Sequence, residues 1–209
     1  MNTLIVLMMS LVGLAAGSNN GNGVGNGGVG FLCDKNGKKE VRVLDLTEMQ
    51  GMPEASLQNL KREEALKKVW QNLERLAPSL SKQYARRFQG FDDHVEFRSD
   101  VDLTKTNDTL HLASPKGCEL KQLAIRRAQK DSLSKDFVID REMWDLMDES
   151  GRTALTLHEI VYDHFAKLGE KNSVKARKIT GYLLSEKSFK DKPEDFWKLI
   201  GELSLPIYQ

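Results

Sequence analysis

The stretch from Thr153 to Leu168 constrains the fold most, because it has the pattern of one amphipathic helix. Its apolar residues recur at steps of three and four, which is the period of an α-helix. These residues are Ala154, Leu155, Leu157, Val161, Phe165 and Leu168. Gly169 follows directly, where a left-handed C-terminal cap is expected. The pattern predicts a helix that packs its apolar side against the rest of the chain.

Two ionisable side chains interrupt this apolar stripe. With about 100° between successive residues, His158 falls in the middle of the stripe and Glu159 at its edge. Tyr162 lies one turn beyond His158 on the same side, while Asp163 and Lys167 are expected to point outwards. A His and a Glu that face a core must be hydrogen-bonded, because an unpaired buried polar group costs about 1–3 kcal/mol. The fold must therefore supply partners for both.

Residues 1–17 have the features of a signal peptide. Met1–Ala16 carries no charged side chain, and its apolar run 4–14 is shorter than the roughly 20 residues that span a bilayer. Small residues at 15–17 make cleavage before Ser18 plausible. A buried N-terminal helix is the alternative. We expect an exported protein, periplasmic or secreted, with no transmembrane segment after cleavage.

Residues 18–30 consist almost wholly of Asn and Gly. Such a segment buries too little apolar surface to offset its ordering entropy, so it is predicted to be a flexible leader. The functional alternative is a glycine-rich phosphate-binding loop. No strand precedes the segment and no Lys-Ser/Thr follows it, so the flexible leader is preferred. Residues 31–209 then form a single domain of ordinary size.

The domain is predicted to be α+β, with a small, mostly antiparallel sheet packed against a helical C-terminal half. Segments 31–33 and 41–44 flank Asn36-Gly37, the strongest short signal for a β-hairpin. Further strands are expected at 95–97, 109–112, 120–128 and 137–139, although a helix is nearly as well supported at 120–128. Other helices are expected at 56–76, from Ser79 or Ser81 to 88, at 141–147 after Asp140, from Asn172 or Ser173 to 185, and from Pro193 onwards.

Cys33 and Cys118 are the only cysteines. An isolated pair in an exported protein predicts one disulfide, which would join the hairpin to the turn ending at Cys118. A nucleophilic thiol with a His partner is the alternative, but no neighbour of either cysteine would lower its pKa.

The 31 basic and 30 acidic side chains nearly cancel, so no overall charge favours nucleic acid. The basic pairs at 86–87 and 126–127 have acidic neighbours and no interleaved aromatic residues. We therefore expect no nucleic-acid binding and an envelope or extracellular partner of unknown identity.

The His158-Glu159 pair resembles part of the zinc-protease signature, in which two histidines four residues apart share a helix face. The position four after His158 is Tyr162, and His164 lies six residues on, rotated by about 120°. One helix cannot present both histidines to one metal, so no metal site or cofactor is predicted.

A metal-free acid/base site is the second possibility. Arg177 on the following helix could pair with Glu159, with Tyr162 and Ser173 completing a polar cluster around His158. If open to solvent, this cluster could bind a small ligand or transfer protons. If closed, it is a buried lock between two helices, which is the interpretation we favour.

Several motifs together carry a resemblance. They are Gly25-Asn-Gly-Gly28 before Cys33, Leu44-Asp-Leu-Thr-Glu48, Pro115-Lys-Gly-Cys118 with Gln122, Ala154–Tyr162, and Asn172-Ser173 before Arg177. In these motifs the chain resembles a group of uncharacterised secreted proteins of Gram-negative bacteria. The resemblance implies an exported bacterial protein and no particular activity or cofactor. It also implies that His158, Glu159, Tyr162, Ser173 and Arg177 belong to one local arrangement.

The sequence thus predicts an exported, non-enzymatic protein with a binding or envelope-associated structural role. A hydrolase or ligand-processing enzyme that uses the His158/Glu159 helix is the alternative. A solvent-open pocket at His158 with a shifted pKa would favour the enzyme, and a dry, fully hydrogen-bonded cluster would favour the binding protein.

Overall fold

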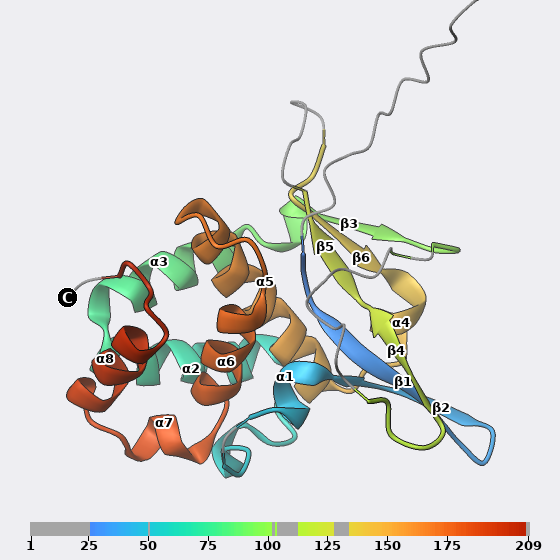
Figure 1. Cartoon of the computed structure of the whole chain (residues 1–209), viewed down its shortest axis with the longest axis horizontal. Coiled ribbons are helices and arrows are strands. Elements are labelled where there is room, and N and C mark those ends of the chain that lie inside the picture. Colours follow the sequence, from blue (N-terminus) through green and yellow to red (C-terminus); the bar gives the residue numbers. More distant parts are fainter. Residues whose placement is uncertain (1–25, 50, 102, 104–112, 128–133, 208–209) are drawn as a thin grey trace, which may run out of the picture.

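The computed structural model describes residues 26–49, 51–101, 103, 113–127 and 134–207. These residues form an α+β fold, with most helices gathered on one side and the strands on the other (Figure 1). The predicted fold class is confirmed. The predicted signal peptide, 1–17, and residues 18–25 of the predicted leader lie outside the described residues.

The first sheet contains the predicted hairpin. Strands β1 (Val29–Lys35) and β2 (Lys38–Val43) are antiparallel, and β4 (Cys118–Gln122) pairs with the other edge of β1, also antiparallel. Asn36 and Gly37 both have positive φ, 58° and 81°, as a tight hairpin turn that follows the twist of the strands requires.

The predicted single sheet is instead two three-stranded sheets in the described part of the chain. The second has the order β3-β6-β5, from β3 (Val95–Arg98), β6 (Phe137–Asp140) and β5 (Ala124–Arg126). Only β3 and β6, of the described pairs, run parallel. The preference for strand at 120–128 is confirmed, as two short strands. The predicted strand at 109–112 lies outside the described residues.

The sheets meet where the chain passes from β4 to β5. The backbone N–H groups of Leu123 and Ala124 both donate to the carbonyl of Gly28, and that of Arg126 donates to the carbonyl of Asn26. Residues just before β1 therefore connect the two sheets.

Six helices of the described part of the chain follow the predicted order, whereas the short helices at 44–47 and 186–190 were not predicted. The helices are α1 (Leu44–Thr47), α2 (Arg62–Leu76), α3 (Pro78–Gln89), α4 (Arg141–Asp145), α5 (Glu149–Lys167), α6 (Val174–Leu183), α7 (Glu186–Lys190) and α8 (Pro193–Glu202), with 3₁₀ turns at η1 (Ala55–Leu57) and η2 (Asp92–His94). The predicted long helix from Ser56 is wrong at its start. Asn59 has a positive φ of 59°, which no α-helix accommodates, so the regular helix begins at Arg62.

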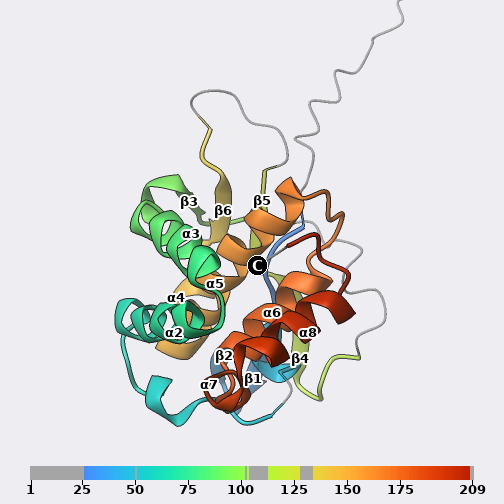
Figure 2. The ribbon, with the colours of Figure 1, turned by 90° about the vertical axis from the view of Figure 1, so that its left-hand side faces the viewer.

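Helix α5 is the predicted central helix. Figure 2 shows it in the interior, between the α2–α3 pair and α6, and it packs against all three. Asp148 caps its start by accepting a hydrogen bond from the N–H of Gly151. Gly169, with φ 98°, follows its end in the predicted left-handed conformation. Nearly every side of the helix is buried, so it is the core element of the fold.

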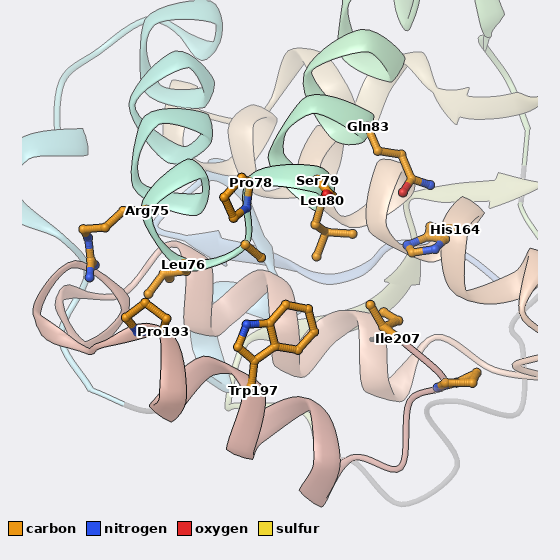
Figure 3. A pocket seen from close by; sticks show the side chains of 12 residues that line it. Arg75, Leu76, Pro78, Ser79, Leu80, Gln83, His164, Pro193, Trp197 and Ile207 are labelled. Atoms are coloured by element: carbon orange, nitrogen blue, oxygen red, sulfur yellow. The ribbon is translucent and has the colours of Figure 1, made fainter. Parts of the chain in front are cut away.

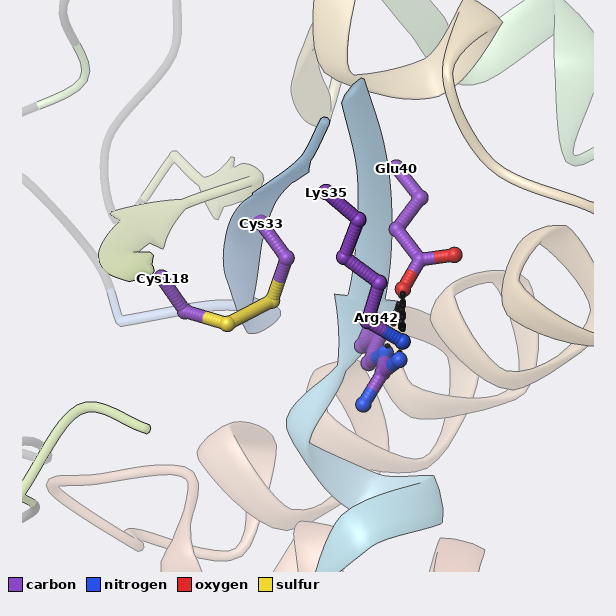
Figure 4. Close-up of a disulfide and its surroundings, with 5 residues drawn as sticks. All are labelled: Cys33, Lys35, Glu40, Arg42 and Cys118. Atoms are coloured by element: carbon purple, nitrogen blue, oxygen red, sulfur yellow. Dashed lines mark hydrogen bonds and ion pairs between the residues drawn. A yellow bond between two sulfur atoms is a disulfide. The ribbon is translucent and has the colours of Figure 1, made fainter. Parts of the chain in front are cut away.

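The predicted disulfide is confirmed. Cys33 and Cys118 are directly opposite in the antiparallel pairing of β1 and β4, and their sulfur atoms are bonded (Figure 4). On β2, beside this bond, Glu40 forms ion pairs with Lys35 and Arg42. The disulfide therefore fixes the β1–β2 hairpin to β4, the strand on the other side of β1.

The end of the predicted leader is part of the folded structure. The leader was predicted to extend to Gly30, whereas β1 begins at Val29 and is buried there. A Cβ atom on Gly27 would lie 2.4 Å from the carbonyl oxygen of Ala124, and one on Gly28 would lie 2.0 Å from Cδ1 of Leu155. These glycines permit close packing, so here the glycine-rich composition does not indicate flexibility.

Candidate functional site

His158 is fully buried and bonded to an acid that follows the hairpin. Its Nδ1 lies 2.7 Å from Oδ1 of Asp45 on α1, and both side chains have 0% exposure. Burial alone would lower the pKa of His158, but the charge and hydrogen bond of Asp45 outweigh burial and raise it above its usual value. His158 and Asp45 therefore form a closed ion pair that joins α5 to α1.

Glu159 is equally buried but has a different partner. Its Oε1 accepts a hydrogen bond of 2.6 Å from the backbone N–H of Gly28. Burial raises the pKa of Glu159 to about 7, because a carboxylate loses its hydration there. The carboxyl group holds the segment before β1 against α5.

Arg177 does not pair with Glu159, so that prediction is wrong. Its Nε donates instead to Oε2 of Glu48 at 2.6 Å. The physical reason is that Glu159 faces the glycine segment, whereas α1 ends beside α6 and presents Glu48 to Arg177. This ion pair joins α6 to the end of α1.

Of the other two predicted residues, Ser173 lies beside the glycine segment and Tyr162 lies beside His158. Ser173 is buried, with its Oγ 3.5 Å from the carbonyl oxygen of Gly27. Tyr162 is also buried, and its ring centroid lies 6.2 Å from that of His158. All five predicted residues are therefore buried where α1, α5, α6 and the glycine segment meet.

Sequence reasoning missed three members of this cluster: Gly28, Asp45 and Glu48. Asp45 stands between Leu44 and Leu46 directly after a strand, and a charged residue in such an apolar setting is the one available signal for a buried partner. Gly28 had no signal, because its contribution is a backbone N–H group that every residue except proline carries.

The geometry is that of a lock between helices. A catalytic acid or base must come within hydrogen-bond reach of its substrate, directly or through one water. His158 and Glu159 have no exposed surface, and each forms one hydrogen bond to a structural partner, while Nε2 of His158 and Oε2 of Glu159 are buried without a hydrogen bond to any described residue. In this conformation neither side chain can touch a substrate.

Asp163 was expected to point outwards, and that prediction is wrong. It is buried and accepts hydrogen bonds from Nε of Arg126 at 2.8 Å and Nζ of Lys167 at 2.6 Å, with Nε of Arg87 at 3.5 Å. Burial alone would raise the pKa of Asp163, but these cations outweigh burial and lower it. Asp163 therefore ties α5 to β5 and α3.

The two histidines of α5 lie on different sides of the helix. His158 contacts Asp45, whereas Nδ1 of His164 lies 3.0 Å from the hydroxyl of Tyr84 on α3. In the parts of the chain that the structure describes, no three His, Cys, Asp or Glu side chains are arranged to hold a metal ion.

An apolar groove of about 510 Å³ opens at the corner between α2 and α3. Figure 3 shows Trp197 of α8 on one side, Pro78 and Leu80 on the other, and Ile207 beside His164. Its volume is in the range of small-molecule sites, roughly 300–1,000 Å³.

A second, polar cavity of about 590 Å³ lies between α6 and α8. Of the five predicted site residues, Arg177 is the one that lines it, with Glu48 beside it. The buried cluster therefore reaches an open cavity through the Arg177 side chain.

No family model, no curated protein and no solved structure matches the chain. Within the described residues, no helix combines the length and the apolar character needed to cross a membrane.

Proposed function

We propose that this chain is an exported, non-enzymatic binding protein of the periplasm or the exterior. Its ligand or partner is held at a surface cavity, and the His158/Glu159 helix is the structural centre of the fold. An envelope-associated structural role belongs to the same class.

The observation that carries this proposal is the complete burial of His158 and Glu159, the residues whose types and positions suggested acid/base catalysis. His158 and Glu159 have 0% exposure, and their hydrogen bonds go to Asp45 and Gly28. The apolar groove and the polar cavity are both of ligand size and open to the surface, so binding requires no opening of the core.

Export is supported by the signal-peptide pattern of residues 1–17 and by the Cys33–Cys118 disulfide. A fusion of residues 1–30 to an alkaline phosphatase that is active only outside the cytoplasm tests it. We expect activity in the Gram-negative periplasm, and loss of activity when Leu7→Arg interrupts the apolar run. A fusion that is inactive, or active regardless of Leu7→Arg, would overturn the export proposal.

The absence of catalysis is tested with chromogenic ester, peptide, glycoside and phosphodiester substrates. The enzyme alternative draws support from the raised pKa of Glu159, since perturbed carboxyl groups occur often at active sites. We expect no turnover by the purified mature protein. Turnover that disappears in a folded Glu159→Gln or His158→Ala variant would establish the enzyme and refute the binding proposal.

A further inference from the structure

Two cavities adjoin along helix α3: the apolar groove described above and a smaller cavity of about 330 Å³. Gln83 of α3 and His164 of α5 line both of them, and Figure 3 shows these two residues at the end of the groove away from Arg75. One face of α3 continues from the groove into the smaller cavity, because Leu80, Gln83 and Arg87 follow at steps of three and four residues. A ligand that lies along this face can therefore contact both cavities.

The groove offers a ligand mainly apolar surface. Apart from Arg75, Ser79, Gln83 and His164, its lining residues are all apolar. The guanidinium of Arg75 donates to two backbone carbonyls and to the side chain of Asn72, so its donors are directed at the protein. Burial lowers the pKa of His164, so its ring is uncharged at neutral pH. This half of the site suits an apolar chain or ring.

The smaller cavity is basic. It is lined by Arg86, Arg87 and Lys167, against one acid, Asp163. Burial alone would raise the pKa of Asp163, but its hydrogen bonds to Lys167 and Arg126 outweigh burial and lower it, so cations dominate around this carboxylate. Helix α3 contributes no acidic residue that could balance its own cations.

The excess of positive charge remains when the partners of these groups are included. Arg87 forms an ion pair with Asp136 at 2.6 Å, and Asp163 forms one with Arg126 at 2.8 Å. Each of these pairs adds no net charge. Arg86 is exposed and forms no ion pair with any described residue. A cavity lined by an excess of one sign attracts the opposite charge, so this half of the site favours an anion over a cation.

We propose that the groove and the basic cavity together bind one single-chain amphiphilic anion, of which a fatty acid is the simplest. The apolar chain lies in the groove and the anionic group lies beside Arg86. The proposal rests on the binding function argued above. A fully polar anion would leave the apolar groove without a partner, whereas an uncharged or cationic chain would leave the positive charge of the cavity uncompensated.

The test is a titration of the full mature chain, observed by NMR at the indole N–H of Trp197 in the groove and the backbone N–H of Arg86 at the cavity. The probes are decanoate, acetate, decan-1-ol and decyltrimethylammonium, each below the concentration at which it forms micelles. We expect decanoate to shift both signals and to saturate at one molecule per chain. Acetate should shift neither signal at the same concentration. The alcohol and the cation should bind about tenfold more weakly than decanoate, because they lack the attraction of the basic cavity.

Three variants separate the two halves of the site. Arg86→Gln should weaken decanoate binding about threefold, as expected for an exposed charge pair, and leave the affinity for decan-1-ol unchanged. Lys67→Gln makes the same change in net charge at an exposed lysine of α2 that lines neither cavity, and it should change nothing. Ile207→Ser removes apolar surface from the groove, so it should weaken decanoate and decan-1-ol by a similar factor.

Binding of decan-1-ol or decyltrimethylammonium as tightly as decanoate would overturn the proposal, because the basic cavity would then not select charge. Equal effects of Arg86→Gln and Lys67→Gln would overturn it for the same reason. A response to acetate as strong as that to decanoate, or no response at Trp197, would show that the groove does not hold the chain.

The binding function is read separately in the polar cavity between α6 and α8, at the Nε–H group of Arg177. The probes there are L-glutamate and L-lysine, which carry opposite net charges. A response at Arg177 with none at Trp197 would refute the amphiphile site and leave the binding function standing. Silence at both places would count against both.

Discussion

At the scale of single residues, the fold depends on a backbone group that approaches a buried acid closely. Gly28 donates to Glu159, and the space that a Cβ atom would need is occupied by Leu155. A glycine is required at this position because any side chain would displace α5 or break the hydrogen bond.

Gly28→Ala should therefore destabilise the protein by about 2 kcal/mol, as expected for overpacking of a closed core. Gly201→Ala on α8 is the matched control, because its Cβ meets nothing within 4 Å and alanine suits a helix. Urea unfolding measures both. Equal stability of the two variants would mean that the segment before β1 does not pack as described.

The buried Glu159 predicts a pH dependence of stability. Its pKa is raised from 4.5 to about 7, so between these values the folded chain binds more protons than the unfolded chain. The free energy of unfolding therefore falls as pH rises through this window, by roughly 1–3 kcal/mol. The raised pKa of His158 acts in the same direction, since its contribution is complete below pH 6.5 and is lost as pH rises through the folded pKa.

Glu159→Gln removes this titration and keeps an oxygen that accepts from Gly28. Urea unfolding between pH 5 and 8 should then give a flatter profile than the wild type. Acids with a lowered pKa, such as Asp163, lose their contribution to folding stability only below this pH range. They therefore do not affect the slope measured between pH 5 and 8. An unchanged slope would show that Glu159 is not the titrating group.

At the scale of elements, the local signals in the sequence were sufficient for most helices. The apolar period of α5, Gly169 after its end, Asp140 before α4 and Pro193 at the start of α8 each act within a few residues. The positive φ of Asn59 and the partners of Glu159 and Arg177 depend on the tertiary fold, so periodicity could not predict them.

The disulfide is a contact between elements far apart in the chain that sequence alone identified, because no other cysteine competes. It closes a sequence separation of 85 residues and joins β1 to β4. Replacing both cysteines by alanine should cost about 4 kcal/mol in the chain-entropy model. Thermal unfolding of the double variant measures the loss. Titration of the denatured, unreduced wild type should find no free thiol, and two thiols would contradict the pairing.

At the scale of the whole molecule, the α+β class followed from the order of the elements, but the division into two sheets did not. The sheets are joined at residues 26–28, which by composition alone resemble a linker. The five residues of the candidate site, His158, Glu159, Tyr162, Ser173 and Arg177, are all buried, and two of them, Glu159 and Ser173, contact this junction directly. The closure of the site could not be predicted, because burial depends on how α1, α5 and α6 pack together.

The central claim is that the His158/Glu159 helix is a closed lock and that ligands bind elsewhere. Exchange of the imidazole Cε1 hydrogen for deuterium, followed by mass spectrometry, tests this claim directly. The exchange proceeds through the protonated ring, so the raised pKa of His158 does not by itself prevent it. His94, with a side chain 43% exposed, is the internal reference against His158 at 0%. We expect His158 to exchange many-fold more slowly than His94 in the native protein and at a similar rate in urea. Comparable native rates would show that solvent reaches His158, and would contradict the account.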